Sequence, residues 1–256
     1  MSYDSASKFN RPGVKVDMAK RDYQKKPFGG EPFSKFLRGV IRLLVAVFIW
    51  PFYLPRAEGS REEPSDGGCI LVANHHNFFD PIFITFYFRS TRLCFIAKKE
   101  LYNAKLIGRI LKAFGAIPLD RSSSDMQASK LIISEIANKK IIGLFPQGTR
   151  VPIGEEISSD PHFGLIHYAI RRDIPIIPVG IDPTYRFFGK PRFVFADSIL
   201  LRLKDGEKLN PDEQTMVAHD VMRRVYALAG REYPRKDNVE NEKLFLRKID
   251  VMPLCK

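Results

Sequence analysis

Short apolar runs alternate with amphipathic stretches from residue 68 to about residue 230. Five of these runs are rich in β-branched or aromatic residues and have no polar face, which is typical of strands buried on both sides. They cover residues 68–73, 92–97, 141–145, 174–181 and 191–196. The pattern therefore predicts a sheet whose two faces are both covered.

Helical periodicity fills the intervals between the runs. Residues 125–139 place apolar side chains at helical spacing, and residues 165–172 form a shorter amphipathic piece. Asn210 and Pro211 predict an N-cap followed by proline in the first turn of a further helix, which runs to about Gly230. This alternation predicts an α/β fold with a mostly parallel central sheet flanked by helices, and places function at the strand-to-helix loops.

The chain before residue 57 divides into two parts. Residues 1–31 are polar and are interrupted by Pro12 and Pro27, so they predict a flexible basic segment. They do not resemble a secretory signal, because such a signal places its apolar stretch nearer the start. Residues 32–56 predict a membrane-interfacial helical segment, for the reasons that follow.

Residues 43–54 read LLVAVFIWPFYL and are apolar all round. A helix of this length extends about 18 Å, short of a hydrocarbon core of roughly 30 Å, so we expect it to lie in the interface or dip into one leaflet. Arg38 and Arg42 precede it and are expected to face anionic lipid. An ordinary buried core helix is the alternative that the run leaves open.

Size and composition bound the rest of the chain. With 256 residues and 45% apolar composition, the sequence supports one catalytic domain over residues 57–230, followed by a charged C-terminal extension over residues 231–256. Its three scattered cysteines predict no disulfide framework, so a reducing, cytosolic-facing site is expected. No set of residues at metal-ligand spacing stands out, since His162 and His167 lack further ligands.

The charge balance narrows the partners. Lys and Arg number 41 against 29 Asp and Glu, so the surface should attract polyanions such as nucleic acid, anionic lipid, coenzyme A or an acidic carrier protein. Nucleic acid is not expected, because zinc spacing, a reading helix and interleaved aromatics on a basic strand are all missing from the sequence. A purely solvating role for the excess charge stays open.

The candidate chemistry concentrates directly after the first long run. Residues 74–81 read NHHNFFDP, and Asp80 before Pro81 suits a helix N-cap with proline at the first turn. His75 then lies on a loop, where a turn lets the Asp80 carboxylate meet its imidazole. Such a carboxylate fixes the imidazole tautomer and stabilises the imidazolium that forms when the ring takes a proton.

This block and three others, in order over roughly residues 70–180, resemble those of the glycerolipid acyltransferase family typified by 1-acylglycerol-3-phosphate acyltransferases, the HX4D acyltransferases. The matching positions are Asn74, His75 and Asp80, then Gly115 and Arg121, then Phe145, Pro146, Gly148, Thr149 and Arg150, and finally the strand around Pro178. The resemblance implies a glycerol-3-phosphate acyltransferase-like fold.

The resemblance also implies an activity: transfer of a fatty acyl group from acyl-CoA or acyl carrier protein to 1-acylglycerol 3-phosphate, making phosphatidic acid without a cofactor. His75 would be the general base and Asp80 its orienting partner. Arg121 and Arg150 would hold the acceptor phosphate. Asn74, Gly115 and residues 145–150 complete the expected substrate site, in a protein bound to anionic lipid at the cytoplasmic membrane face.

The sequence departs from the family pattern at two positions. Gln147 stands where the family usually has Glu, and His162 stands where a lysine often precedes Gly164. We still place Gln147 in the substrate site, since its amide keeps an acceptor and adds donors. Another acceptor, such as glycerol 3-phosphate or a different lysolipid, and a noncatalytic membrane-surface binding protein on the same scaffold both stay open.

Overall fold

The computed structural model describes residues 30–64, 67–120, 126–204, 207–234 and 248–254. The predicted flexible segment, residues 1–31, lies almost entirely outside the described residues, as does much of the predicted C-terminal extension.

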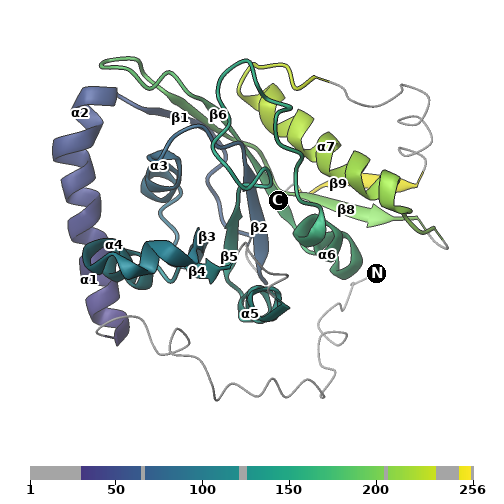
Figure 1. Cartoon of the computed structure of the whole chain (residues 1–256), viewed down its shortest axis with the longest axis horizontal. Coiled ribbons are helices and arrows are strands. Elements are labelled where there is room, and N and C mark those ends of the chain that lie inside the picture. Colours follow the sequence, from purple (N-terminus) through teal and green to yellow (C-terminus); the bar gives the residue numbers. More distant parts are fainter. Residues whose placement is uncertain (1–29, 65–66, 121–125, 205–206, 235–247, 255–256) are drawn as a thin grey trace, which may run out of the picture.

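Within the described residues, nine strands form one sheet, in the order β1-β7-β6-β2-β5-β3-β4, with β8 pairing with β6 and β9 (Figure 1). The five strands from β6 to β4 along this order run parallel, whereas β7 and β8 run antiparallel to β6. The strands are β1 Arg56–Gly59, β2 Cys69–Ala73, β3 Leu93–Lys98, β4 Ile117–Leu119, β5 Ile141–Leu144, β6 Ile176–Asp182, β7 Arg192–Phe195, β8 Ile199–Leu203 and β9 Ile249–Pro253.

Helices cover both faces of this sheet. They are α1 Gly30–Leu44, α2 Trp50–Tyr53, α3 Asp80–Tyr87, α4 Lys105–Ala113, α5 Met126–Ala137, α6 Gly164–Arg172 and α7 Pro211–Leu228, with a π-helical turn at Val45–Ile49 and a 3₁₀ turn at Lys99–Asn103. The mostly parallel sheet flanked by helices confirms the predicted fold class.

The central strand β2 shows why the predicted runs are apolar throughout. Ile70 and Val72 point into a core built with α5, α6 and α7, while Cys69, Leu71 and Ala73 point into a second core with α3 and the N-terminal helix. All five side chains are buried. Because alternate side chains of a strand face opposite sides, only a strand covered on both sides has an unbroken apolar sequence.

The predicted elements are confirmed, and others appear that the patterns did not predict. Each of the five predicted strands is present, as β2, β3, β5, β6 and β7. Helix α7 begins as predicted: the Asn210 side chain accepts from the Glu213 N–H, and the Glu213 carboxylate accepts from the Asn210 N–H. Strands β1, β4, β8 and β9 were not predicted, and β9 places residues 249–253 in the sheet rather than in an extension.

The N-terminal helix is longer than predicted. It runs from Gly30 through α1, the π-helical turn and α2 to Tyr53, so the expectation of a helix about 18 Å long is wrong. Residues 35–53 are long and apolar enough to cross a membrane by length and composition, extending about 28 Å. Pro51 is tolerated because it follows the π-helical turn, in the first turn of α2.

The arginines of this helix do not face lipid, which corrects the second expectation. Arg38 is buried; its Nε donates to the Ala113 carbonyl at 3.2 Å and its guanidinium lies 5.0 Å from the Phe114 ring centroid. Arg42 donates to the Thr85 carbonyl at 3.4 Å. The helix therefore turns these two arginines toward the domain. Its outer face is apolar and exposed, with Phe36, Leu43, Leu44, Val47, Phe48, Trp50 and Phe52.

Candidate active site

Three loops meet where parallel strands end. His75 follows β2, Phe145 follows β5 and Tyr185 follows β6, and these three strands are parallel neighbours. Their carboxyl ends therefore lie at one edge of the sheet, where α/β proteins place their ligands.

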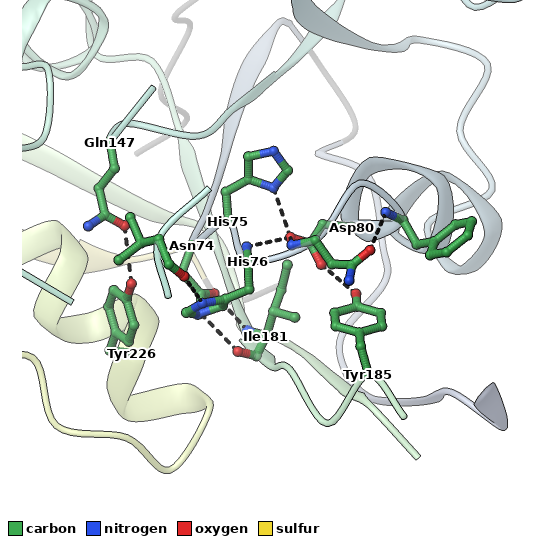
Figure 2. A network of polar contacts seen from close by, with 11 residues as sticks. Asn74, His75, His76, Asp80, Gln147, Ile181, Tyr185 and Tyr226 are labelled. Carbon is green, nitrogen blue, oxygen red and sulfur yellow. Dashed lines mark hydrogen bonds and ion pairs between the residues drawn. The ribbon is translucent and has the colours of Figure 1, made fainter. Parts of the chain in front are cut away.

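His75 and Asp80 are in contact, as the sequence predicted (Figure 2). The Nδ1 atom of His75 lies 2.8 Å from Oδ2 of Asp80. A turn in which the Asp80 N–H donates to the Asn77 carbonyl at 3.1 Å brings them together. Because a carboxylate accepts, Nδ1 carries the hydrogen, and the lone pair is left on Nε2.

The Asp80 carboxylate is fully buried and surrounded by donors. Besides His75, its Oδ2 accepts from the backbone N–H of His76 at 2.7 Å and of Asn77 at 2.8 Å, and its Oδ1 accepts from the Tyr185 hydroxyl. Four donors compensate the loss of hydration, so the carboxylate is held in one orientation.

Asp80 does not cap α3, which corrects the prediction of an N-cap at this residue. It is the first residue of α3, and its carboxylate points back to the loop rather than to the helix. The N-cap is Phe79, which makes no side-chain cap hydrogen bond, although Pro81 does lie in the first turn as predicted. The carboxylate is thus used to close the His75 loop.

The His75 ring is held on its other side by an aromatic side chain. The Phe145 ring stacks on it at 4.1 Å between centroids. The His75 side chain is 19% exposed, and its Nε2 has no hydrogen-bond partner among the described residues. An unoccupied basic nitrogen that is reachable from solvent suits a general base.

His76 and Asn74 fasten the loops to one another. His76 Nδ1 donates to the Val151 carbonyl at 2.6 Å, and its Nε2 accepts from Asn74 Nδ2 at 2.9 Å. Burial lowers the pKa of His76, in keeping with a neutral ring. The Asn74 amide also donates to the Ile181 carbonyl and accepts from the Ile181 N–H, both at 2.8 Å. The Asn74 amide, which was predicted to contact substrate, therefore binds the backbone of β6.

Gln147 lies away from His75, against α7. Its Nε2 donates to the carbonyls of Glu156 at 2.7 Å and Ser159 at 3.3 Å. Its Oε1 accepts from the Tyr226 hydroxyl at 3.1 Å, as Figure 2 shows. The side chain is buried and its donors and acceptor are used by the protein. The structure gives Gln147 a part in shaping the loop, whereas the sequence predicted a substrate contact.

The rest of this loop faces solvent. Pro146 is buried, but Thr149 and Arg150 are exposed, and the Arg150 guanidinium makes no hydrogen bond or ion pair with a described residue. Gly148 has φ +67°, and a Cβ there would lie 3.2 Å from the His162 ring. The loop then comes back to the His75–Asp80 pair, the dyad, because the Val151 N–H donates to the His75 carbonyl at 2.8 Å.

The second predicted block is not brought to the dyad as a whole. Gly115, with φ +64°, lies in the turn between α4 and β4, before the strand begins and so toward the opposite edge of the sheet. Arg121 lies outside the described residues, two positions after the end of β4.

Two tyrosines that shape the site were not predicted from the sequence. Tyr185 reaches Asp80 from 105 residues away, and Tyr226 reaches Gln147 from 79 residues away. Burial raises the pKa of Tyr226 and, with the Asp80 charge, that of Tyr185, so both hydroxyls remain protonated donors. For Tyr185 a signal existed: it lies four residues after a predicted strand, in the loop that follows it.

Two other kinds of catalytic group, a metal-ligand cluster and a reactive thiol, are not found among the residues that the structure describes. No three His, Cys, Asp or Glu side chains among the described residues come together around a metal. Cys69 and Cys94 are buried, and burial raises the pKa of each thiol to about 12, so neither is a thiolate nucleophile at neutral pH. The candidate catalytic side chain is therefore His75.

A histidine oriented by a buried carboxylate, at the carboxyl edge of a parallel sheet, is an arrangement that suits general-base chemistry in an α/β protein. The chain belongs to the acyltransferase family, whose profile matches residues 55–182, half of the sequence. The matched region begins just after the N-terminal helix and contains the loops after β2 and β5, but it ends at the last residue of β6, so Tyr185 lies outside it.

Named relatives are similar over part of their length. The 1-acyl-sn-glycerol-3-phosphate acyltransferase of Streptococcus pneumoniae is 29% identical over 153 residues, which is 59% of this chain and 54% of that protein. The protein of the same name from Bacillus subtilis is 33% identical over 87 residues, 34% of this chain and 44% of that protein. The chain thus spans about half the length of these curated relatives.

A solved structure shows the same fold. The crystal structure of the 1-acyl-sn-glycerophosphate (LPA) acyltransferase PlsC from Thermotoga maritima aligns with a TM-score of 0.55 at 23% identity, over 80% of this chain and 84% of that chain.

Proposed function

We propose that the protein transfers a fatty acyl group from an acyl thioester to the free hydroxyl of 1-acylglycerol 3-phosphate, which makes phosphatidic acid. The observation that carries this proposal is the His75–Asp80 contact of 2.8 Å with the His75 Nε2 left open. The names of the relatives supply the acceptor, since the pair alone specifies only a hydroxyl.

The geometry supports a direct transfer. The acceptor hydroxyl gives its proton to His75 Nε2 as its oxygen attacks the thioester carbonyl carbon. The C–S bond then breaks, and the imidazolium returns the proton to the leaving thiolate, so that a thiol departs. Asp80 stays ionised and stabilises the imidazolium through Nδ1. A positioned base of this kind contributes about two to four powers of ten in rate.

Two arginines are assigned to the acceptor phosphate. Arg150 directly precedes Val151, whose backbone N–H donates to the carbonyl of His75. The backbone of Arg150 is therefore close to His75. Arg121 is assigned the same role from the sequence. A guanidinium fork matches two phosphate oxygens, and each charge-assisted hydrogen bond contributes about 1.5–3 kcal/mol. Thr149 is exposed beside Arg150 and offers a hydroxyl donor.

The N-terminal helix is assigned to the membrane. Its apolar face is exposed while its arginines bind the domain, an arrangement that suits contact with lipid on one side and with protein on the other. A lipid acceptor is held in the bilayer by roughly 0.8 kcal/mol per CH₂, so an enzyme gains by meeting it there. We place the catalytic domain on the cytoplasmic face, where acyl-CoA or acyl carrier protein would be the donor.

A donor and acceptor panel tests the proposal. Purified protein is given acyl-CoA or acyl carrier protein thioesters with lysophosphatidate, glycerol 3-phosphate or an uncharged lysolipid, and products are separated by mass. We expect phosphatidic acid from lysophosphatidate with wild type and none above background with His75→Ala. Faster transfer to glycerol 3-phosphate would replace the acceptor. No transfer from any donor would favour the noncatalytic binding protein.

A further inference from the structure

Tyr185 connects the dyad to a distant part of the fold. It lies three residues after the end of β6, and its hydroxyl donates to Asp80 Oδ1, the oxygen opposite the one that holds His75 (Figure 2). We propose that Tyr185 is a positioning residue for the transfer reaction: it fixes the rotation of the Asp80 carboxylate and moderates its basicity, which sets the pH at which His75 becomes a free base.

The two carboxylate oxygens of Asp80 have different partners. Oδ2 accepts from His75 and from two backbone N–H groups, whereas Oδ1 accepts from the Tyr185 side chain. Those three contacts gather at one oxygen, and the Tyr185 hydroxyl constrains the other. Without it, the plane of the carboxylate is less constrained about its Cβ–Cγ bond, and Oδ2 is held less firmly in line with Nδ1.

Tyr185 is a permanent neutral donor. Burial, with the Asp80 charge as the second cause, raises the pKa of its phenol well above the usual range, so the hydroxyl keeps its proton at any working pH. The titratable side chains that contact Asp80 among the described residues are His75 and Tyr185, with the buried ring of His76 nearby and Tyr53 behind Tyr185.

The N-terminal helix holds Tyr185 in place. The Tyr53 ring meets the Tyr185 ring edge-on at 6.1 Å between centroids, and Phe83 of α3 stacks on it at 6.4 Å. The backbone after Tyr185 is bonded to the same helix end, because Phe188 N–H donates to the Phe52 carbonyl at 2.7 Å and Lys190 N–H to the Tyr53 carbonyl at 3.0 Å. The exposed apolar helix is therefore connected to the carboxylate through one tyrosine.

The Tyr185 hydroxyl changes the basicity of Asp80, and the direction of this change can be stated. A hydroxyl that donates to the carboxylate withdraws charge from it, and so weakens its hold on the imidazolium. Removing the hydroxyl makes Asp80 a stronger base and stabilises protonated His75. The proton that must leave His75 before catalysis is then lost at higher pH, so the acid limb of kcat/KM moves upward. One hydrogen bond to a charged group corresponds to a shift of about one pH unit.

The test compares Tyr185→Phe with Tyr87→Phe in the full chain. Tyr87 is a matched control: it is half-buried like Tyr185, and its hydroxyl donates to the Pro55 carbonyl at 2.6 Å, but it does not reach the dyad. We measure kcat, KM, the pH profile of kcat/KM, and the pH at which the His75 ring titrates by NMR. The activity readouts rest on the proposed function, whereas the NMR readout does not.

With Tyr185→Phe we expect kcat to fall about tenfold, KM to stay within about twofold, and both the acid limb and the His75 titration to rise by about one pH unit. Tyr87→Phe should lower only the melting temperature. In wild type labelled with 3-fluorotyrosine the phenol is a stronger donor, so the acid limb of kcat/KM should move to lower pH. This measurement requires no amino-acid substitution.

Two results would overturn the inference. One is a pH of His75 titration that does not change in Tyr185→Phe, and the other is a loss of kcat that is the same in Tyr185→Phe and Tyr87→Phe. If wild type transfers no acyl group from any donor, the proposed function fails, and the NMR shift alone decides the role of Tyr185.

Discussion

The Nδ1 atom of His76 lies 2.6 Å from the carbonyl oxygen of Val151, and this hydrogen bond joins the loop after β2 to the loop after β5. The same ring accepts from Asn74, so its two nitrogens have opposite roles and only the neutral form satisfies both. Protonation would turn the acceptor into a donor facing the donor of Asn74.

His76 thus predicts a pH-dependent stability. Burial lowers the pKa of His76, so the folded state favours the neutral ring, and its contribution is complete above the unfolded value of about 6.5 and is lost as the pH falls through the lower folded value. His76→Gln keeps a donor and an acceptor but does not titrate. We expect the stability gap between wild type and His76→Gln to shrink below pH 6.5, as measured by urea unfolding; a constant gap would contradict this.

Asp80→Asn should abolish most activity. The amide retains one acceptor oxygen but cannot stabilise an imidazolium, so we expect kcat to fall about a thousandfold. The melting temperature should also fall, because the new NH₂ must face a donor: the Tyr185 hydroxyl or the N–H groups at Oδ2. Asp212→Asn, in the first turn of α7, is the control. Equal rates for the two variants would remove Asp80 from the mechanism.

Gln147→Glu, the residue that the family usually has here, should destabilise this chain. The carboxylate would face the carbonyl oxygens of Glu156 and Ser159, where the amide now donates, at a cost of about 1–3 kcal/mol. In a domain of this size that lowers the melting temperature by several degrees, roughly 2–4 °C per kcal/mol. Gln214→Glu changes a half-buried amide that water reaches, and should alter it less. Calorimetry at pH 8 makes the comparison.

Arg150→Ala should act on the acceptor rather than on the chemistry. The exposed guanidinium is assigned to phosphate, so its loss should raise KM for lysophosphatidate about tenfold to a hundredfold and change kcat less. Arg121→Ala should do the same. Arg172→Ala, exposed at the far end of α6, is the matched control. If neither Arg150→Ala nor Arg121→Ala alters acceptor kinetics, the phosphate lies elsewhere.

Charges on the outer face of the N-terminal helix should release the protein from lipid. Leu43→Glu with Phe48→Glu replaces two side chains that are 63% and 64% exposed, so folding should be little affected. Each apolar group buried in lipid contributes about 1.5–3 kcal/mol, so vesicle flotation should show binding weaker by tenfold or more. Ile133→Glu on α5, at a side chain that is 36% exposed, adds one such charge elsewhere as the control. Undiminished flotation of the double variant would place the anchor on another surface.

The fold and half of the site were predictable because their causes are local. An unbroken apolar run, as in β2, indicates a strand that is buried on both faces. The His75–Asp80 contact follows from one turn before Pro81. By contrast, the partners of Tyr185 and Gln147 are decided by which strands and helices become neighbours, which a single sequence pattern does not state.

The length of the N-terminal helix was missed for a different reason. Arg38 and Arg42 interrupt the apolar pattern, and charged residues ordinarily end a stretch that meets lipid. Here each guanidinium finds a carbonyl of the domain, at Ala113 and Thr85. The helix can therefore continue through both positions, because tertiary hydrogen bonds replace the water that the pattern assumed.

Strand β9 forms one border of the sheet. Its residues pair antiparallel with β8, from Leu203 opposite Ile249 to Ile199 opposite Pro253. Cutting the chain before Ile249 would leave the amides and carbonyls of β8 open along that border, and a bare border of this kind recruits another molecule. Residues 249–253 therefore shield the backbone of β8, and a variant that lacks them should self-associate more readily.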